Sequence, residues 1–246
     1  QRDWNKNISA ASSTIQTALN LYPDDIDVLL IAASIMASSG QKIGQKSLRD
    51  VLDTVLKKDP NNAFAQELLI SEYLNLEDWN SAYNLSFSLI NKKNYSTQIL
   101  LQHIKSCIAL KLSSEARNTF ILLKNYSVEK NILDLVEVQI LIAEGRKAEA
   151  LNLIQKALSE YSGKIKSNFY YEKSRIASND DQKLSDLRSS LTANPRNPEA
   201  LFALYEYYFK KADYRKAQYY LRQVVALNPE SKKLAELNAK LDTLIN

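Results

Sequence analysis

The chain has 246 residues with only 4 Gly and 5 Pro, and it is rich in good helix formers. This composition predicts an almost wholly helical protein, because strand-and-hairpin proteins usually use more Gly and Pro in their turns. Its 32 basic and 28 acidic residues are mixed along the chain, so the net charge of +4 does not indicate nucleic-acid binding, while a single cysteine excludes an intrachain disulfide and no apolar run approaches the ~20 residues of a membrane span.

The predicted elements follow one another at a regular interval. The first is a helix within residues 1–25 that Pro23 closes, and Pro60 follows 37 residues later. Small residues then recur every 34 residues, at Ala82, Ala116 and Ala150. Near the C-terminus, Pro195 and Pro229 are again 34 residues apart. This period predicts stacked helical hairpins, each of which buries its apolar face against its neighbours.

The segment 198–231 shows the period most regularly. Its apolar, aromatic, acidic and small positions are Leu201, Leu204, Tyr208, Asp213, Tyr214, Ala217, Leu221, Leu227 and Pro229. The stretches "LYPDD", "KDPNN", "ANPRN" and "LNPES" are similar to turns that close a repeat, and "AEGRKAEAL" is similar to a turn between two helices. In these residues the chain resembles the tetratricopeptide-repeat family over nearly its whole length. The resemblance implies an all-α fold, an α-solenoid of stacked antiparallel helical hairpins that forms a superhelix.

The resemblance also implies a domain organisation. Residues 1–25 would be the lone second helix of an incomplete first repeat, so that the native protein is expected to continue N-terminally. Six repeats are expected at 26–62, 63–96, 97–130, 131–163, 164–197 and 198–231. Residues 232–246 are expected to form a C-terminal capping helix. Its apolar stripe would consist of Leu234, Leu237, Leu241 and Leu244.

The sequence offers few residues for catalysis or metal binding. Its one histidine, His103, lies four residues before Cys107, so both would face one side of a helix. A zinc site usually needs three or four ligands, and a regular helix supplies no oxyanion donors for a Cys–His nucleophile pair. The four glycines are scattered and form no phosphate-binding loop. We therefore expect packing for His103 and Cys107, and no enzyme activity, metal site or cofactor.

A partner-binding surface follows from the resemblance, because the first helices of such repeats line a concave groove. At the groove-facing positions, the last two repeats carry Phe202, Glu206, Phe209, Lys210, Phe169, Glu172 and Arg175. The middle repeats carry Leu101, Lys105 and Gln139 at such positions. Phe202 and Phe209 are expected two turns apart on one side of a helix, where they would flank one side chain of a bound peptide.

The preferred interpretation is a non-catalytic bacterial scaffold that binds a protein or peptide in this groove. An alternative is a periplasmic or lipoprotein-like assembly subunit of a transporter or outer-membrane machine, since the chain begins with Gln1 rather than Met and a removed leader would explain this. A third interpretation is the interaction arm of a larger enzyme. Cytoplasmic and periplasmic locations, and self-association of the solenoid, all stay open at this point.

Overall fold

The computed structural model describes residues 2–228 and 231–245, with side chains from residue 10 onward apart from that of residue 232. In this part of the chain every regular element is an α-helix, and the one extended contact is an isolated bridge between Ile43 and Lys46. The prediction of an all-α fold is therefore confirmed. Within the same residues, no helix combines the length and the apolar character that crossing a bilayer requires.

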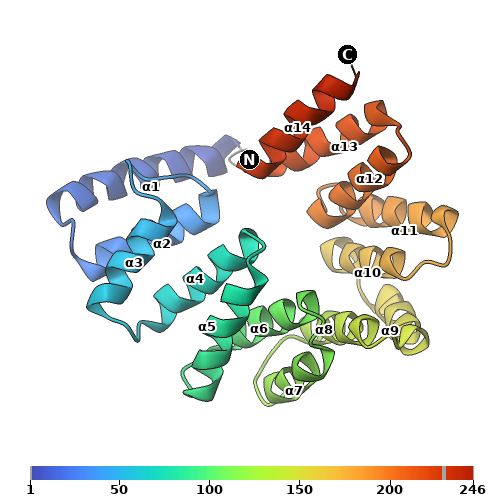
Figure 1. Ribbon diagram of the computed structural model, residues 1–246, viewed down its shortest axis with the longest axis horizontal. Helices are drawn as coiled ribbons and strands as arrows, with labels where there is room; N and C mark the ends of the chain where they lie inside the picture. Colours follow the sequence, from blue (N-terminus) through green and yellow to red (C-terminus); the bar gives the residue numbers. More distant parts are fainter. Residues whose placement is uncertain (1, 229–230, 246) are drawn as a thin grey trace. The chain divides into compact units, whose positions relative to one another are not determined.

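The chain divides into two compact units, Gln1–Tyr126 and Ser127–Asn246. The described helices of unit 1, blue to green in Figure 1, are α1 (Arg2–Leu21), α2 (Ile26–Ser39), α3 (Leu48–Lys58), α4 (Ala63–Asn75), α5 (Trp79–Asn91), α6 (Thr97–Ala109) and α7 (Ser113–Leu123). Those of unit 2, yellow-green to red, are α8 (Lys130–Ala143), α9 (Lys147–Glu160), α10 (Gly163–Arg175), α11 (Asp180–Ala193), α12 (Pro198–Lys210), α13 (Tyr214–Leu227) and α14 (Lys232–Ile245).

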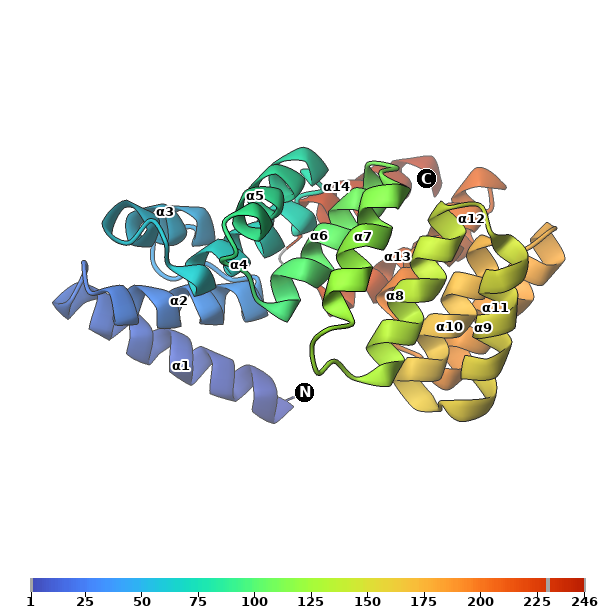
Figure 2. The same cartoon turned by 90° about the horizontal axis from the view of Figure 1, so that it is seen from below.

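Consecutive helices pack as hairpins in each unit. The pairs are α2 with α3, α4 with α5, α6 with α7, α8 with α9, α10 with α11, and α12 with α13. Figure 2 shows the neighbouring helices of a pair running side by side. We call the first member of each pair a first helix and the other a second helix. First helices also contact one another, α4 with α6 in unit 1 and α8 with α10 in unit 2. The boundaries of the six expected repeats stay a prediction.

Polar caps mark where many helices begin. The capping side chains that accept a hydrogen bond from the backbone N–H three residues later are Asp25, Ser47, Asn62, Asp78, Ser96, Asn179, Asn197 and Asp213. Ser47 and Asp50 cap each other reciprocally at the start of α3. Each cap satisfies one of the N–H groups that a helix start leaves without a partner, so these residues set the helix boundaries.

The tight turns between first and second helices share one backbone feature. The residues in the left-handed region at these turns are Glu77, Lys111, Gly145 and Ala212, with φ of 57°, 62°, 76° and 57°. Gly145 adopts this conformation without steric strain, whereas the other three carry a Cβ that disfavours it. The packing of the two helices therefore imposes the turn even where the sequence supplies no glycine.

The periodic small residues lie where the helices approach most closely. Ala82, Ala116, Ala150 and Ala217, each near the start of a second helix, are all fully buried. Larger side chains fill the first helices at another recurring position, where Ile70, Ile104 and Val138 are buried. In α10 and α12 this position holds Tyr171, which is half-buried, and Tyr205, which is buried. The apolar core is therefore a series of layers between neighbouring helices.

The closing helix α14 packs on unit 2 through part of its leucine stripe. Leu234 and Leu241 are buried and Leu237 is partly buried in the same cluster. Leu244, in contrast, is 43% exposed, and Ile245 packs against the cluster instead. The expected stripe is therefore wrong at its last member, because the side chain that follows Leu244 occupies the apolar contact at the helix end.

Candidate functional site

In unit 2, three of the predicted groove residues form one hydrogen-bonded group. Gln139 lies on α8, whereas Glu172 and Arg175 lie on α10. Gln139 Nε2 donates to Glu172 Oε1 at 2.7 Å, and Arg175 Nη1 donates to Glu172 Oε2 at 2.6 Å. Glu172 is buried, whereas 38% of the Arg175 side chain is exposed. Glu172 therefore acts as an anchor that holds Arg175 and Gln139 in place at the surface.

Acidic groups of α12 lie near this group. Burial raises the pKa of Tyr171 to about 12, and the carboxylates of Glu172, Glu199 and Glu206 act in the same direction. Glu199 and Glu206 belong to α12, so the first helices α10 and α12 present their polar side chains to the same region. The surface around Arg175 therefore combines a fixed cation with several carboxylates.

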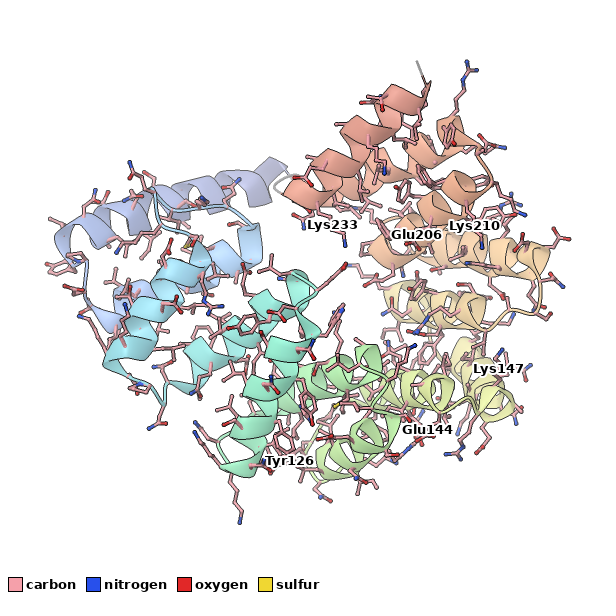
Figure 3. The ribbon with its side chains drawn as sticks, viewed as in Figure 1. Tyr126, Glu144, Lys147, Glu206, Lys210 and Lys233 are labelled. Carbon is pink, nitrogen blue, oxygen red and sulfur yellow. The ribbon has the colours of Figure 1, made fainter. Side chains whose placement is uncertain are left out.

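The α12 face carries a row of three aromatic rings. The ring centroids of Phe202 and Tyr205 are 5.3 Å apart, and those of Tyr205 and Phe209 are 5.8 Å apart. Phe202 and Phe209 are half-buried, so part of each ring is open, while Tyr205 is buried between them. Glu206 and Lys210 are exposed on successive turns of the same helix (Figure 3). Aromatic surface next to charges of both signs is typical of a peptide contact.

Phe169 does not belong to this surface. It is fully buried, and its ring stacks on Tyr161 with centroids 5.7 Å apart. The same apolar cluster contains Val138 and Ile154, from α8 and α9. The Phe169 side chain therefore fills the core between α8, α9 and α10 and offers no area to a partner, which corrects its assignment to the groove.

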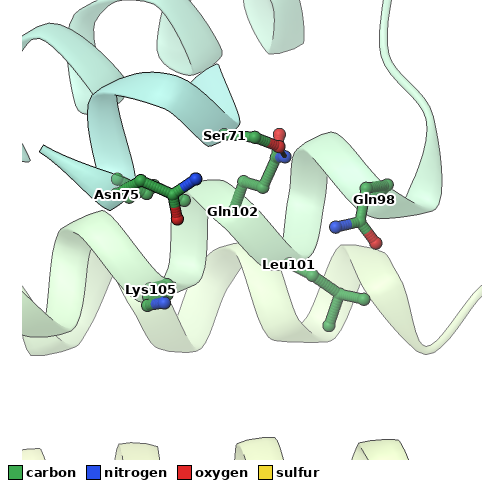
Figure 4. Close-up of a pocket in the computed structure, with 7 residues that line it drawn as sticks. Ser71, Asn75, Gln98, Leu101, Gln102 and Lys105 are labelled. Atoms are coloured by element: carbon green, nitrogen blue, oxygen red, sulfur yellow. Dashed lines mark hydrogen bonds between the residues drawn. The ribbon is translucent and has the colours of Figure 1, made fainter. Parts of the chain in front are cut away.

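In unit 1, Leu101 and Lys105 line a pocket of about 220 Å³ between the first helices α4 and α6 (Figure 4). Its other lining residues are Ser71, Leu74, Asn75, Gln98 and Gln102. Gln102 is buried, and its Nε2 donates to Ser71 Oγ at 2.6 Å, which ties the two helices together. Leu101 is half-buried and Lys105 exposed, so they provide the accessible apolar and cationic parts of this pocket.

A group of hydrogen-bonded polar side chains lies inside unit 1. The sequence had indicated only two of its members, His103 and Cys107. His103 is 1% exposed, and its Nδ1 lies 2.8 Å from Ser86 Oγ. Its Nε2 lies 3.4 Å from Cys107 Sγ and 3.6 Å from Glu115 Oε1. Tyr83 donates its hydroxyl hydrogen to Glu115 Oε2 at 2.9 Å. These residues come from three helices, so no local sequence pattern connects them.

The protonation state of Cys107 argues against its acting as a nucleophile. Burial, followed by the Glu115 carboxylate, raises the pKa of the Cys107 thiol to about 12. The thiol therefore stays protonated at neutral pH, whereas a cysteine nucleophile must be a thiolate. In the described part of the chain, no three His, Cys, Asp or Glu side chains are arranged to hold a metal ion.

The buried His103 should make stability depend on pH. Burial lowers the pKa of His103, although Glu115 acts in the opposite direction. The unfolded chain, with a histidine pKa of about 6.5, then binds the proton more readily than the folded chain. The stabilisation is present above about pH 6.5 and is lost as the pH falls through the folded pKa, with a slope of at most about 1.4 kcal/mol per pH unit for one proton.

Urea unfolding of the wild type and of the His103→Gln variant, followed by circular dichroism between about pH 7.5 and pH 5, measures this effect. His103 is the one histidine of the chain, so the difference between the two curves isolates its titration. Parallel curves for the two proteins would contradict a neutral, buried His103.

Comparison with known proteins identifies the fold. A scan against family models and a search of curated proteins found no match. Among solved structures, a tetratricopeptide repeat protein from Parabacteroides merdae matches with a TM-score of 0.66 at 15% identity, over 98% of this chain and 94% of that one. YrrB, described as a TPR protein with an unusual peptide-binding site, matches with a TM-score of 0.41 at 16% identity, over 77% of this chain and 97% of its own. From the first of these likenesses and the helical hairpins described above, the chain has the tetratricopeptide-repeat fold that its sequence indicates.

Proposed function

We propose that this protein is a non-catalytic interaction scaffold that binds a peptide segment of a partner protein on the faces formed by its first helices. The observation that carries the proposal is the α12 row, in which the half-open rings of Phe202 and Phe209 lie beside the exposed Glu206 and Lys210. A bound peptide would bury these rings and would meet the charges at the edge of the contact.

The anchored Arg175 supports the same proposal. Its guanidinium is held by Glu172, which is itself bonded to Gln139. A side chain that is already positioned loses less conformational entropy on binding than a free one does. Arg175 would therefore favour a peptide with an acidic side chain or a backbone carbonyl near the α12 rings. In unit 1, Leu101 and Lys105 would supply a comparable apolar and basic contact.

The test begins with short random peptides selected for binding to the purified protein, whose affinities are then measured by fluorescence anisotropy. We expect the double variant Phe202→Ser, Phe209→Ser to weaken the selected peptides at least tenfold, or by about 1.4 kcal/mol or more. A matched control is Tyr219→Ser, which removes a 63% exposed aromatic ring from the second helix α13.

Circular dichroism must show that the double variant keeps its helices, because both rings also pack against the core of unit 2. The Arg175→Gln variant provides an independent measurement, since it removes an exposed charge and leaves the aromatic row intact. The proposal is contradicted if both groups of variants bind the selected peptides as tightly as the wild type does.

A further inference from the structure

A second pocket of unit 1 lies on the side of the second helices. It has a volume of about 470 Å³ and is lined by Phe87, Ile90, His103, Ser114, Glu115, Asn118, Thr119 and Leu122. All of these residues except His103 come from the second helix α5 or α7. The pocket lined by Leu101 and Lys105 is instead formed by the first helices α4 and α6. The second pocket is therefore distinct from the proposed peptide-binding faces.

Glu115 places a negative charge in this pocket. Its side chain is 32% exposed, and the residues that line the pocket include no lysine or arginine. The Tyr83 hydroxyl donates to Oε2, which favours the carboxylate form without neutralising its charge. Glu115 Oε1 lies within ion-pair distance of Nε2 in the His103 ring. Since that ring is buried and its pKa is lowered, it is neutral at pH 7 and does not balance the carboxylate.

The contacts of Glu115 with its neighbours leave this carboxylate with unused acceptor capacity. The Ser86 hydroxyl lies 2.6 Å from the Ala82 carbonyl oxygen and has one hydrogen to donate to it. His103 Nδ1 lies 2.8 Å from Ser86 Oγ, and which of the two atoms donates depends on the tautomer of the ring. Glu115 Oε1 lies 3.6 Å from His103 Nε2, which is longer than an ordinary hydrogen bond, and each carboxylate oxygen accepts more than one hydrogen bond, so acceptor sites stay available to a ligand.

Aromatic and aliphatic groups surround the carboxylate. Phe87 is 41% exposed, and its ring stacks on Tyr83 with centroids 5.6 Å apart. Tyr83 in turn stacks on His103 at 5.1 Å, so the three rings support one another. Ile90 and Leu122 add apolar lining, while Asn118 adds an amide oxygen that can accept a hydrogen bond. A ligand that fits must combine a positive charge with a flat or apolar surface.

We propose that this pocket binds the guanidinium group of an arginine side chain from a partner protein. A guanidinium donates two parallel hydrogen bonds to a carboxylate, here Glu115, and its flat faces stack on an aromatic ring, here Phe87. Its remaining N–H groups can donate to the side-chain oxygens of Asn118 and Thr119, which also line the pocket. A lysine ammonium is a strongly hydrated point charge and makes neither the bidentate contact nor the stacking contact, so arginine is preferred.

The experiment is an NMR titration of the full chain with Nα-acetyl-arginine methylamide. The lysine and citrulline analogues are titrated in parallel, since citrulline keeps nearly the shape of arginine but has no charge. We expect the arginine compound to shift backbone amide signals of α5 and α7 and to lower the apparent pKa of His103, because a bound cation disfavours the imidazolium. The citrulline compound should bind at least tenfold more weakly.

A matched pair of variants links binding to the carboxylate. Glu115→Gln should weaken the arginine compound at least tenfold. Glu149→Gln should leave binding unchanged, because Glu149 lies 34 residues later in α9 and already pairs with Arg146 at 2.6 Å. If Glu115→Gln lowers the melting temperature strongly, Phe87→Leu tests the stacking contact with the carboxylate intact and should also weaken binding.

Equal binding of the arginine and citrulline compounds would overturn the proposal, as would unchanged arginine binding in folded Glu115→Gln. Equal binding of the lysine compound would overturn the guanidinium assignment. A loss of peptide binding in the Phe202 and Phe209 variants bears on the first-helix faces alone, so the two proposals fail independently.

Discussion

Replacement of Phe169 by alanine is expected to lower the free energy of unfolding of unit 2 by about 3–5 kcal/mol. Its side chain is fully buried and contacts apolar residues of α8 and α9 as well as its own helix. Removing the ring leaves a cavity between three helices and also removes the stack on Tyr161. Urea unfolding followed by circular dichroism measures the loss, with each transition fitted separately if the units unfold in separate steps.

The same variant separates a core role from a binding role for Phe169. Phe202→Ala is the control, because Phe202 is half-buried on α12 and should lose less stability. Selected peptides should respond in the opposite order, with a larger effect from Phe202→Ala. If Phe169→Ala left stability within about 1 kcal/mol of the wild type, a core position for this ring would be wrong.

The second large effect is expected at Asn197, where alanine should cost about 2–4 kcal/mol. Asn197 is 1% exposed, and its Oδ1 accepts from Ala200 N–H at 2.9 Å, which caps α12. Its Nδ2 donates to Ser167 Oγ at 2.9 Å and to Asn168 Oδ1 at 3.2 Å on α10. Alanine would remove the cap from the Ala200 N–H of α12 and would break both hydrogen bonds to α10, although Ser167 Oγ keeps its hydrogen bonds to Ser190.

Asn179→Ala is the matched control for this prediction. Asn179 caps α11 in the same way, accepting from Gln182 N–H at 2.8 Å, but its side chain is exposed. Its loss should cost only about 1 kcal/mol, the usual value of a cap. Urea unfolding of both variants gives the comparison, and equal losses would show that the bonds from Asn197 to α10 add nothing to the cap.

The buried positions of the hairpins could be predicted from the sequence, because they depend on side-chain size and on spacing along the chain. Ala82, Ala116, Ala150 and Ala217 recur in the sequence and are all fully buried. A small side chain lets two helices approach closely, so a larger side chain at this position would clash with the neighbouring helix. The all-α class followed from composition for a comparable reason, since helix propensity is a property of each residue and its neighbours.

The exposed side of the helices was less predictable. Phe169 and Phe202 occupy similar groove-facing positions in the expected repeats, yet one is fully buried and the other is half-open. A small rotation of a helix about its own axis changes which neighbouring surface a long side chain covers. That rotation depends on how the neighbouring helices pack. The division into two units at Tyr126 and Ser127 was likewise not visible in the residue spacing.

The sequence by itself determined that this protein is built from helical hairpins at a regular interval, and it indicated the tetratricopeptide-repeat fold. These properties depend on residues that are close in the chain, through propensity, capping, turns and the 34-residue period. Only the tertiary structure decided that Gln139 of α8 meets Glu172 of α10, and that Glu115, Tyr83 and Ser86 surround His103. These groups join side chains from different helices, whose distances and burial are set by how the helices pack.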